Sequence, residues 1–169
     1  MNFNTALIGL IEIVSAISIG VFILLLTYKI LKWIGRRYYD IQHKNLAYSI
    51  FMAAMMFSVG YMVSGVIAPL ISSFRLLNID NAFLLTVTFI GRGALYVGIS
   101  YVSALLIGLL STTLYTRMTP IDEFAEIKNN NVGVALIVAS IIITLTLLSK
   151  DGVALILESI TPYPDLPPR

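Results

Sequence analysis

The stretch TPIDEFAEIKNNNVGVALIVASIIITLTLLSKDG, from Thr119 to Gly152, decides the fold because a polar, acidic segment leads directly into a long apolar run. Residues 132–149 carry no charge, and about 18 such residues are enough to cross the hydrocarbon core of a bilayer. Their many β-branched side chains do not argue against a helix, because only helices and closed barrels satisfy their backbones in lipid. The stretch therefore predicts a transmembrane helix that ends on the Lys150–Asp151 pair.

The polar half of the stretch predicts a short amphipathic helix at the membrane surface. Thr119 is the expected N-cap, Pro120 the first helical residue, and Asp122 the acid three residues after the cap. The apolar face would hold Ile121, Phe124 and Ala125, and the acidic face Asp122, Glu123 and Glu126. Asn131 follows, and it is the expected N-cap of the long apolar helix.

The run LYTRMTPIDEFAEIKNNNVGVALIVAS, residues 114–140, resembles the bacterial YjfL-like inner-membrane family, which carries domain of unknown function 350. The family pattern is Tyr-Thr, then Thr-Pro with acids, then Ile-x-x-x-Asn leading into a small-residue helix. Here Asn130-Asn131-Val132 replaces the usual Gly-Asn-hydrophobic step, and Gly133 stands among expected alanines. The resemblance covers most of the chain and implies four helices in a bacterial inner membrane, with no established activity.

The composition independently predicts an integral membrane protein. Of 169 residues, 58% are hydrophobic and 12% are charged, whereas soluble domains carry roughly 25% charged residues. Because the chain has no cysteine, disulfides, thiol nucleophiles and cysteine metal sites are excluded. The one histidine, His43, excludes a multi-histidine metal site within one chain. A net charge of +2 is too small to indicate a nucleic-acid partner.

The apolar runs predict an all-α polytopic membrane protein with four transmembrane helices in two tandem helix pairs. Residues 1–72 form the first pair and 92–160 the second, with an outer connection and interfacial segment at 73–91 and a proline-rich tail at 161–169. The first three spans are expected near Thr5–Trp33, Asn45–Ile71 and Ala94–Thr116. Residues 82–116 as one helix would measure about 52 Å, longer than the hydrocarbon core, so 82–90 is expected in the interface or beyond it. We interpret the N-terminal run as the first span rather than a cleaved signal.

Two segments with the same spacing indicate an internal repeat. Asp40-Ile41-x-x-x-Asn45 and Glu126-Ile127-x-x-x-Asn131 each lead into an apolar helix, so Asn45 and Asn131 are equivalent caps. A pseudo-twofold axis along the membrane normal is expected. The charges reverse at equivalent loop positions, with Arg36 and Arg37 against Asp122 and Glu123. The two loops either pair, within the chain or between subunits, or are solvated independently.

Small residues recur every four positions on the second and third helices, which lets neighbouring helices approach closely. The helix-packing residues expected from this pattern are Gly60, Ser64, Ala68, Ser100, Ala104 and Gly108. Ala16 and Gly20 form a shorter pair of the same kind on the first helix.

Basic residues predict the orientation. Those on the loop side are Lys29, Lys32, Arg36, Arg37, Lys44, Arg117 and Lys128, against Arg75, Arg92, Lys150 and Arg169 on the other side. The positive-inside rule then places the loops, with the charges of Arg36, Arg37, Asp122, Glu123 and Glu126, in the cytoplasm and both termini in the periplasm. Aromatic residues within the first basic cluster indicate an interfacial anchor rather than a nucleic-acid site.

The remaining charges are expected at the outer edge of the hydrocarbon, about 28–37 Å from the cytoplasmic boundary. This outer charged layer consists of Glu12, Arg92, Lys150 and Asp151. Its members could snorkel or form interhelix salt bridges, or they could form a ring that attracts an ion in an oligomer.

No phosphate loop, nucleophile elbow or metal-spaced cluster occurs in the sequence, so we expect neither an enzyme nor a bound cofactor. The preferred function is a structural or regulatory subunit of an oligomeric membrane assembly, in contact with the lipid bilayer, with cytoplasmic loops that bind membrane or cytoplasmic partners. The alternative is a homo-oligomeric ion or small-solute channel lined by the hydroxyls of Ser100, Ser103, Ser111 and Thr112. Hydroxyls in membrane helices more often bond to their own backbone, which favours the first function.

Overall fold

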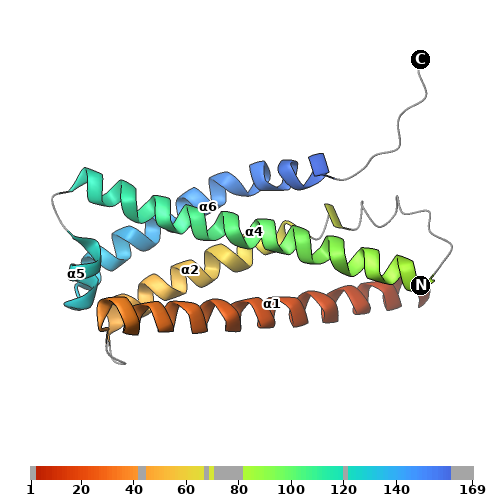
Figure 1. The fold of residues 1–169 in the computed structure, drawn as a ribbon, viewed down its shortest axis with the longest axis horizontal. Coiled ribbons are helices and arrows are strands. Elements are labelled where there is room, and N and C mark those ends of the chain that lie inside the picture. Colours follow the sequence, from red (N-terminus) through yellow and green to blue (C-terminus); the bar gives the residue numbers. More distant parts are fainter. Residues whose placement is uncertain (1–2, 42–44, 67–68, 71–81, 120–121, 161–169) are drawn as a thin grey trace, which may run out of the picture.

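The computed structural model describes residues 3–41, 45–66, 69–70, 82–119 and 122–160. Every element within this part of the chain is a helix (Figure 1). The helices are α1 (Phe3–Tyr39), α2 (Leu46–Ser64), α4 (Ala82–Met118), α5 (Glu123–Lys128) and α6 (Val132–Ile160).

Four of these helices, α1, α2, α4 and α6, are long and apolar enough to cross a membrane. Large apolar side chains such as Phe22, Leu109 and Leu148 are exposed on their outer surfaces, as lipid contact requires. The predicted all-α polytopic architecture with four transmembrane helices is therefore confirmed, and the chain is a multi-pass membrane protein.

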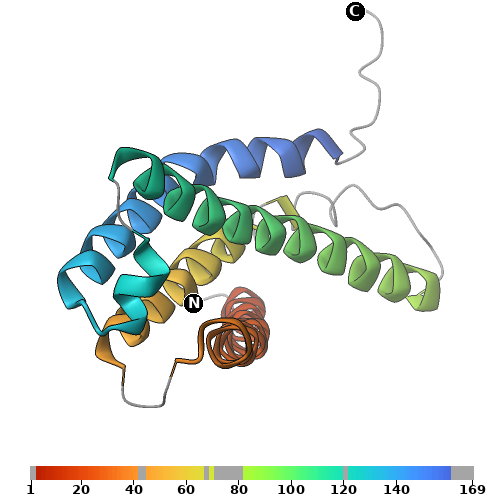
Figure 2. The same ribbon diagram turned by 60° about the vertical axis from the view of Figure 1, so that its left-hand side comes forward.

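The helices form a bundle with a compact end and an open end. The end of α1, the start of α2, α5 and the start of α6 gather at one end, which we call the loop end, while α1 begins and α6 ends at the opposite end (Figure 1). Along the bundle, α2 packs chiefly against α6, α4 packs against both of them, and α1 packs along α2. Figure 2 shows α4 diverging from α1 toward its own first turns.

Two buried apolar clusters fill the bundle. The cluster at the loop end includes Leu31, Ile41, Phe51, Ile127 and Ile142. The second includes Ile23, Val59, Met62, Tyr96 and Leu157. Between them along α2 and α6, the buried hydroxyls of Ser58 and Thr146 share a hydrogen bond of 2.5 Å. Such a bond between membrane helices contributes about 0.6 kcal/mol, so packing rather than polarity holds α2 against α6.

Two helices have other bounds than the expected spans. The helix that contains the third span begins at Ala82, before the expected start of the span near Ala94, and it continues through Gly91, Arg92 and Gly93. Glycine is tolerated in a membrane helix, since breaking the backbone hydrogen bonds there costs more than the flexibility of glycine. Helix α2 ends at Ser64 with Gly65 as its C-cap, rather than at Ile71.

The small residues of α4 face the interior. Ser100, Ala104 and Gly108 are buried, and a Cβ on Gly108 would overlap the side chain of Met55 on α2. The small residues predicted to pack on the second helix are Gly60, Ser64 and Ala68. A Cβ on Gly60 would lie 3.8 Å from Leu24 Cδ2 on α1. Ser64 is exposed and donates to the Tyr61 carbonyl at 2.7 Å, and Ala68 lies outside the described residues.

The close approach of α4 to α2 predicts different effects for two leucine substitutions on the same helix. Gly108→Leu should destabilise the protein by about 1–3 kcal/mol through overpacking against Met55. Gly98→Leu is the matched control, because a Cβ there meets nothing within 4 Å. Thermal melting in detergent, followed by circular dichroism, checks the difference. Equal melting temperatures for both variants would contradict the packing.

Candidate functional site at the loop end

The surface helix α5 begins three residues later than the sequence predicts. Its N-cap is Asp122, whose Oδ1 accepts a hydrogen bond from the Ala125 amide at 3.1 Å. The expected N-cap, Thr119, instead donates its hydroxyl to the Tyr115 carbonyl at 3.0 Å and so completes the end of α4. The expected first helical residue, Pro120, lies outside the described residues. Thr119 therefore terminates one helix rather than beginning the next.

The α5 helix ends in a Schellman motif that leads directly into α6. Asn130 adopts a left-handed conformation with φ 62°, which asparagine tolerates better than most residues. Its amide donates to the Ile127 carbonyl at 3.0 Å, and the Asn131 amide donates to the Glu126 carbonyl at 2.9 Å. The Asn131 side chain then accepts from the Val134 amide at 3.3 Å, which is the expected N-cap contact of α6. One tripeptide thus ends α5 and begins α6.

Asn45 joins the two loops of the bundle. Its Oδ1 accepts from the Tyr48 amide at 2.7 Å, which is the expected N-cap of α2. Its Nδ2 donates to the carbonyls of Ile127 and Lys128, at 2.7 and 3.0 Å, at the end of α5. In return, Asn130 Oδ1 accepts from the Ala47 amide at 3.0 Å. We call the three residues Asn45, Asn130 and Asn131 the asparagine bridge.

The caps at Asn45 and Asn131 were predicted from their spacing, but their junction and the role of Asn130 were not. One sequence feature could have indicated that the two caps meet. The two equally spaced motifs precede helices that are expected to start on the same side of the membrane. Helix-starting residues on one side can meet only if the helices pack against each other, and the sequence does not specify that α2 packs against α6.

An aromatic and aliphatic layer supports the asparagine bridge. Tyr39 from α1 stacks on Phe124 from α5, with ring centroids 4.3 Å apart. Ile41, just after the end of α1, and Ile127, in the last turn of α5, are both buried in the loop-end cluster. The Tyr48 hydroxyl donates to the Leu31 carbonyl. The two loops therefore share one core.

Glu123 occupies the buried face of α5, which differs from the predicted amphipathic pattern. It is only 3% exposed and lies one turn before the fully buried Ile127, whereas Ala125 of the expected apolar face is exposed. Its Oε2 accepts from the Thr116 hydroxyl at 2.8 Å, and its Oε1 has no hydrogen-bond partner within the described residues. The contact of Ile127 with the core fixes the rotation of α5, and residues four apart share a face. Hydrophobic patterning alone assigned Glu123 to solvent.

The other loop charges lie at the surface. Arg36, Arg37 and Asp122 are exposed, and Glu126 is half-buried, with its Oε2 accepting from Asn131 Nδ2 at 2.8 Å. The two loops meet instead through Lys128 Nζ and Asp40 Oδ2, 3.9 Å apart, with the basic residue on the second loop. Both side chains are largely exposed, so this pair contributes little to stability. Pairing of Arg36 and Arg37 with acids of another subunit stays a prediction.

Of the predicted outer charged layer, Lys150 has a defined aromatic contact within the described residues. Lys150 is half-buried, and its ammonium lies 4.1 Å from the centre of the Tyr61 ring on α2. Asp151 is exposed, Arg92 is half-buried on α4, and the side chain of Glu12 lies outside the described residues. The Tyr61 ring thus stabilises the Lys150 ammonium through a cation–π contact. Within the residues that the structure describes, no three Asp, Glu, His or Cys side chains come together to hold a metal ion.

Two substitutions at Asn45 separate its capping role from its bridging role. Asn45→Ala should lower stability by about 2 kcal/mol, because a cap is worth about 1 kcal/mol and the two bonds to α5 are lost as well. Asn45→Asp keeps the cap acceptor and loses only the Nδ2 donor, so about half of that loss is expected. Exposed Asn129 provides the control, and Asn129→Ala should change stability by less than about 0.5 kcal/mol. Denaturant titration measures all three, and equal stability of wild type and Asn45→Ala would refute the bridge.

The burial of Glu123 predicts that its charge is not required for folding. Glu123→Gln keeps an oxygen that can accept from Thr116 and removes a buried charge, so stability should hold or rise by about 1 kcal/mol. Glu123→Ala removes the acceptor and leaves a void, so stability should fall by about 1–2 kcal/mol. Thermal melting of the two variants is the test. A loss in Glu123→Gln as large as in Glu123→Ala would show that a cation pairs with this carboxylate.

Comparison with known proteins bears on this bundle as a whole. No curated protein and no solved structure matches the chain. The model of one protein family, described as Domain of Unknown Function (DUF350), matches residues 5–153. That span runs from the first turn of α1 into α6 and includes the whole loop end, while the narrower YjfL-like name stays a prediction. The chain therefore belongs to the family of Domain of Unknown Function (DUF350) proteins.

Proposed function

We propose that the protein is a non-enzymatic subunit, structural or regulatory, of an oligomeric assembly in the bacterial inner membrane, with the loop end as its partner-binding surface. Cytoplasmic loops, periplasmic termini and the tandem pairing of helices about a pseudo-twofold axis belong to this proposal. It keeps the functional expectations from the sequence, and it rests on the small-residue pair Ala16 and Gly20 of α1.

The observation that carries the proposal is the unused packing surface of α1. Ala16 is exposed, and a Cβ on Gly20 would meet nothing within 4 Å. Small residues four apart allow close helix approach in membranes, where helix association depends on van der Waals packing. On α4 the comparable residues are buried against the rest of the chain. The α1 pair is therefore available to a helix of another subunit.

The loop end supports a docking role. The helix ends that meet there are joined by the asparagine bridge and by the Tyr39–Phe124 stack. The surface of the loop end is therefore ordered before a partner binds. An ordered surface lowers the conformational entropy lost on association.

A homo-oligomeric channel is the alternative, and one observation favours it. Ser100 is fully buried in α4, and its hydroxyl oxygen has no hydrogen-bond partner within the described residues. However, Ser111 and Thr112 donate to the Ile107 and Leu109 carbonyls of their own helix. These hydroxyls are buried within one subunit, so an ion pore between the subunits of an oligomer would have to be lined by other residues.

The test is the mass of the intact particle after gentle detergent extraction from native membranes. We expect wild type to carry stoichiometric partner subunits and Gly20→Leu to release them as a folded, smaller particle. Gly152→Leu is the control, because a Cβ there also meets nothing within 4 Å while the site lies on α6. A monomeric wild-type particle would overturn the proposal. A closed homo-oligomer that conducts ions in liposomes would establish the alternative.

A further inference from the structure

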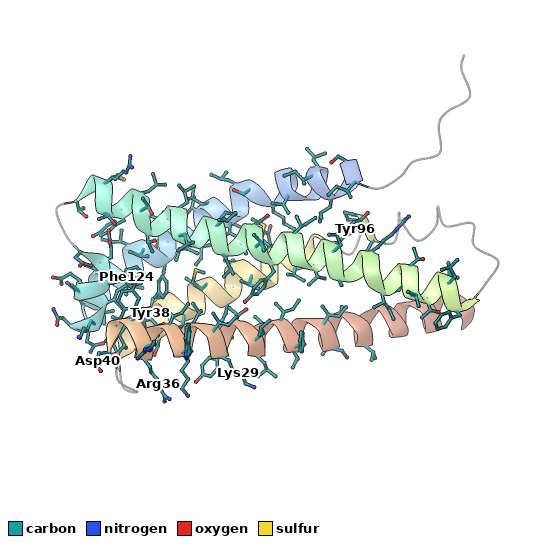
Figure 3. The ribbon with its side chains drawn as sticks, viewed as in Figure 1. Lys29, Arg36, Tyr38, Asp40, Tyr96 and Phe124 are labelled. Carbon is teal, nitrogen blue, oxygen red and sulfur yellow. The ribbon has the colours of Figure 1, made fainter. Side chains whose placement is uncertain are left out.

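The last third of α1 carries a hollow whose lining, among the described residues, consists of basic and aromatic side chains. Its volume is about 420 Å³, and it is lined by Lys29, Lys32, Trp33, Arg36 and Arg37, which we call the basic hollow. Figure 3 shows Lys29 and Arg36 on the side of α1 that points away from the other helices. Four cationic groups around one hollow, with no acid among the described residues of its lining, fit a phosphate-bearing ligand.

The nearest acid along the chain, Asp40, is oriented toward α5. Its Oδ2 lies 3.9 Å from Lys128 Nζ on the second loop. Within the hollow, Lys32 Nζ lies 5.4 Å from the centre of the Tyr28 ring, and Trp33 packs edge-on against Tyr38 at 5.6 Å. Aromatic rings thus border the cationic groups on two sides.

The position of the hollow along α1 corresponds to the headgroup layer. Residues 13–28 carry no charge and span about 24 Å of helix. Lys29 and Arg36 are then about 10 Å apart along the axis, comparable with the roughly 5–8 Å headgroup layer of one leaflet. Trp33 is 57% exposed, at the level where tryptophan anchors membrane helices.

The same face of α1 continues into the hydrocarbon as an apolar strip. The residues Phe22, Leu26, Lys29, Trp33 and Arg36 follow spacings of four, three, four and three, which place them on one side of a helix. Phe22 is 68% exposed and Leu26 is 40% exposed. The face is therefore apolar over the first part of its length and cationic over the rest, in the same order as the acyl chains and headgroup of a lipid.

We infer that the basic hollow is a binding site for an anionic phospholipid of the leaflet at the loop end. The phosphate lies among the Lys29, Lys32 and Arg36 cations, and an acyl chain lies along Leu26 and Phe22. A soluble phosphate compound would use the cations but leave the apolar strip unoccupied, so the combination favours a lipid. Juxtamembrane basic residues each strengthen binding to anionic lipid. The inference does not depend on the oligomeric assembly proposed above.

Trp33 is the single tryptophan of the chain, so its fluorescence reports on this site alone. The full-length protein is reconstituted into vesicles that contain an increasing mole fraction of brominated lipid, either phosphatidylglycerol or phosphatidylcholine. Bromine quenches only nearby tryptophan. We expect the phosphatidylglycerol form to quench Trp33 at a mole fraction about tenfold lower than the phosphatidylcholine form.

Matched variants then test the hollow itself. Lys29→Gln with Arg36→Gln should reduce that preference to about twofold or less. Arg117→Gln with Lys128→Gln removes the same charge at the same end of the bundle but outside the hollow, and it should leave the preference intact. Equal melting temperatures for the two double variants will show that both are folded.

Three results would overturn the inference. Equal quenching of wild type by the two lipids would show no anionic preference. An equal loss in both double variants would show that diffuse charge, rather than the hollow, attracts the lipid. Relief of quenching by millimolar glycerol phosphate would show that the ligand is a soluble phosphate compound.

Discussion

The hydrogen bonds of Asn45 connect the two halves of the chain, and the loop end depends on them. One amide side chain begins α2 through its oxygen and ends α5 through its nitrogen. A helix end without such partners leaves carbonyl and amide groups unpaired, which is costly near a membrane because little water is available. Because Asn45 bonds to the start of α2 and to the end of α5, it fixes the position of α5 beside the first turn of α2. The packing of α2 along α6 then follows, because α6 begins directly after the Schellman motif that Asn130 completes.

The requirement of the bilayer that every backbone group be paired explains which features were predictable from sequence. Because of this requirement, the four long helices could be predicted from the lengths of the apolar runs. The caps at Asn45 and Asn131 could be predicted from their residue type and position before those runs. The same requirement explains why α4 continues through Gly91, Arg92 and Gly93, since lipid supplies no alternative partners for a broken helix. Glycine marks turns in water far more reliably than it does in hydrocarbon.

Features that depend on contacts between helices could not be predicted from the sequence. Glu123 was placed on the solvent side because carboxylates usually lie there, but α5 has only six residues and its rotation is set by Ile127. The Asp40–Lys128 contact joins the two loops through a pair that the loop sequences did not suggest, because charge alternation says nothing about which loop residues face each other. Likewise, the small residues of α4 and the pair on α1 have the same pattern in sequence, yet Gly108 is buried and Gly20 meets no neighbour.

The difference between the two ends of the bundle connects the proposed assembly with the proposed lipid site. At the loop end, α1 is held by the Tyr39–Phe124 stack and by the contact of Tyr48 with Leu31, so the basic hollow is carried on an anchored part of the helix. Toward its start, α1 lies away from the first turns of α4 (Figure 2). There Ala16 is exposed, and a Cβ on Gly20 would meet nothing within 4 Å. A lipid at the hollow would therefore contact a helix whose opposite end is available to another subunit. Because the two sites lie on one continuous helix, lipid composition could influence subunit association through the tilt of α1.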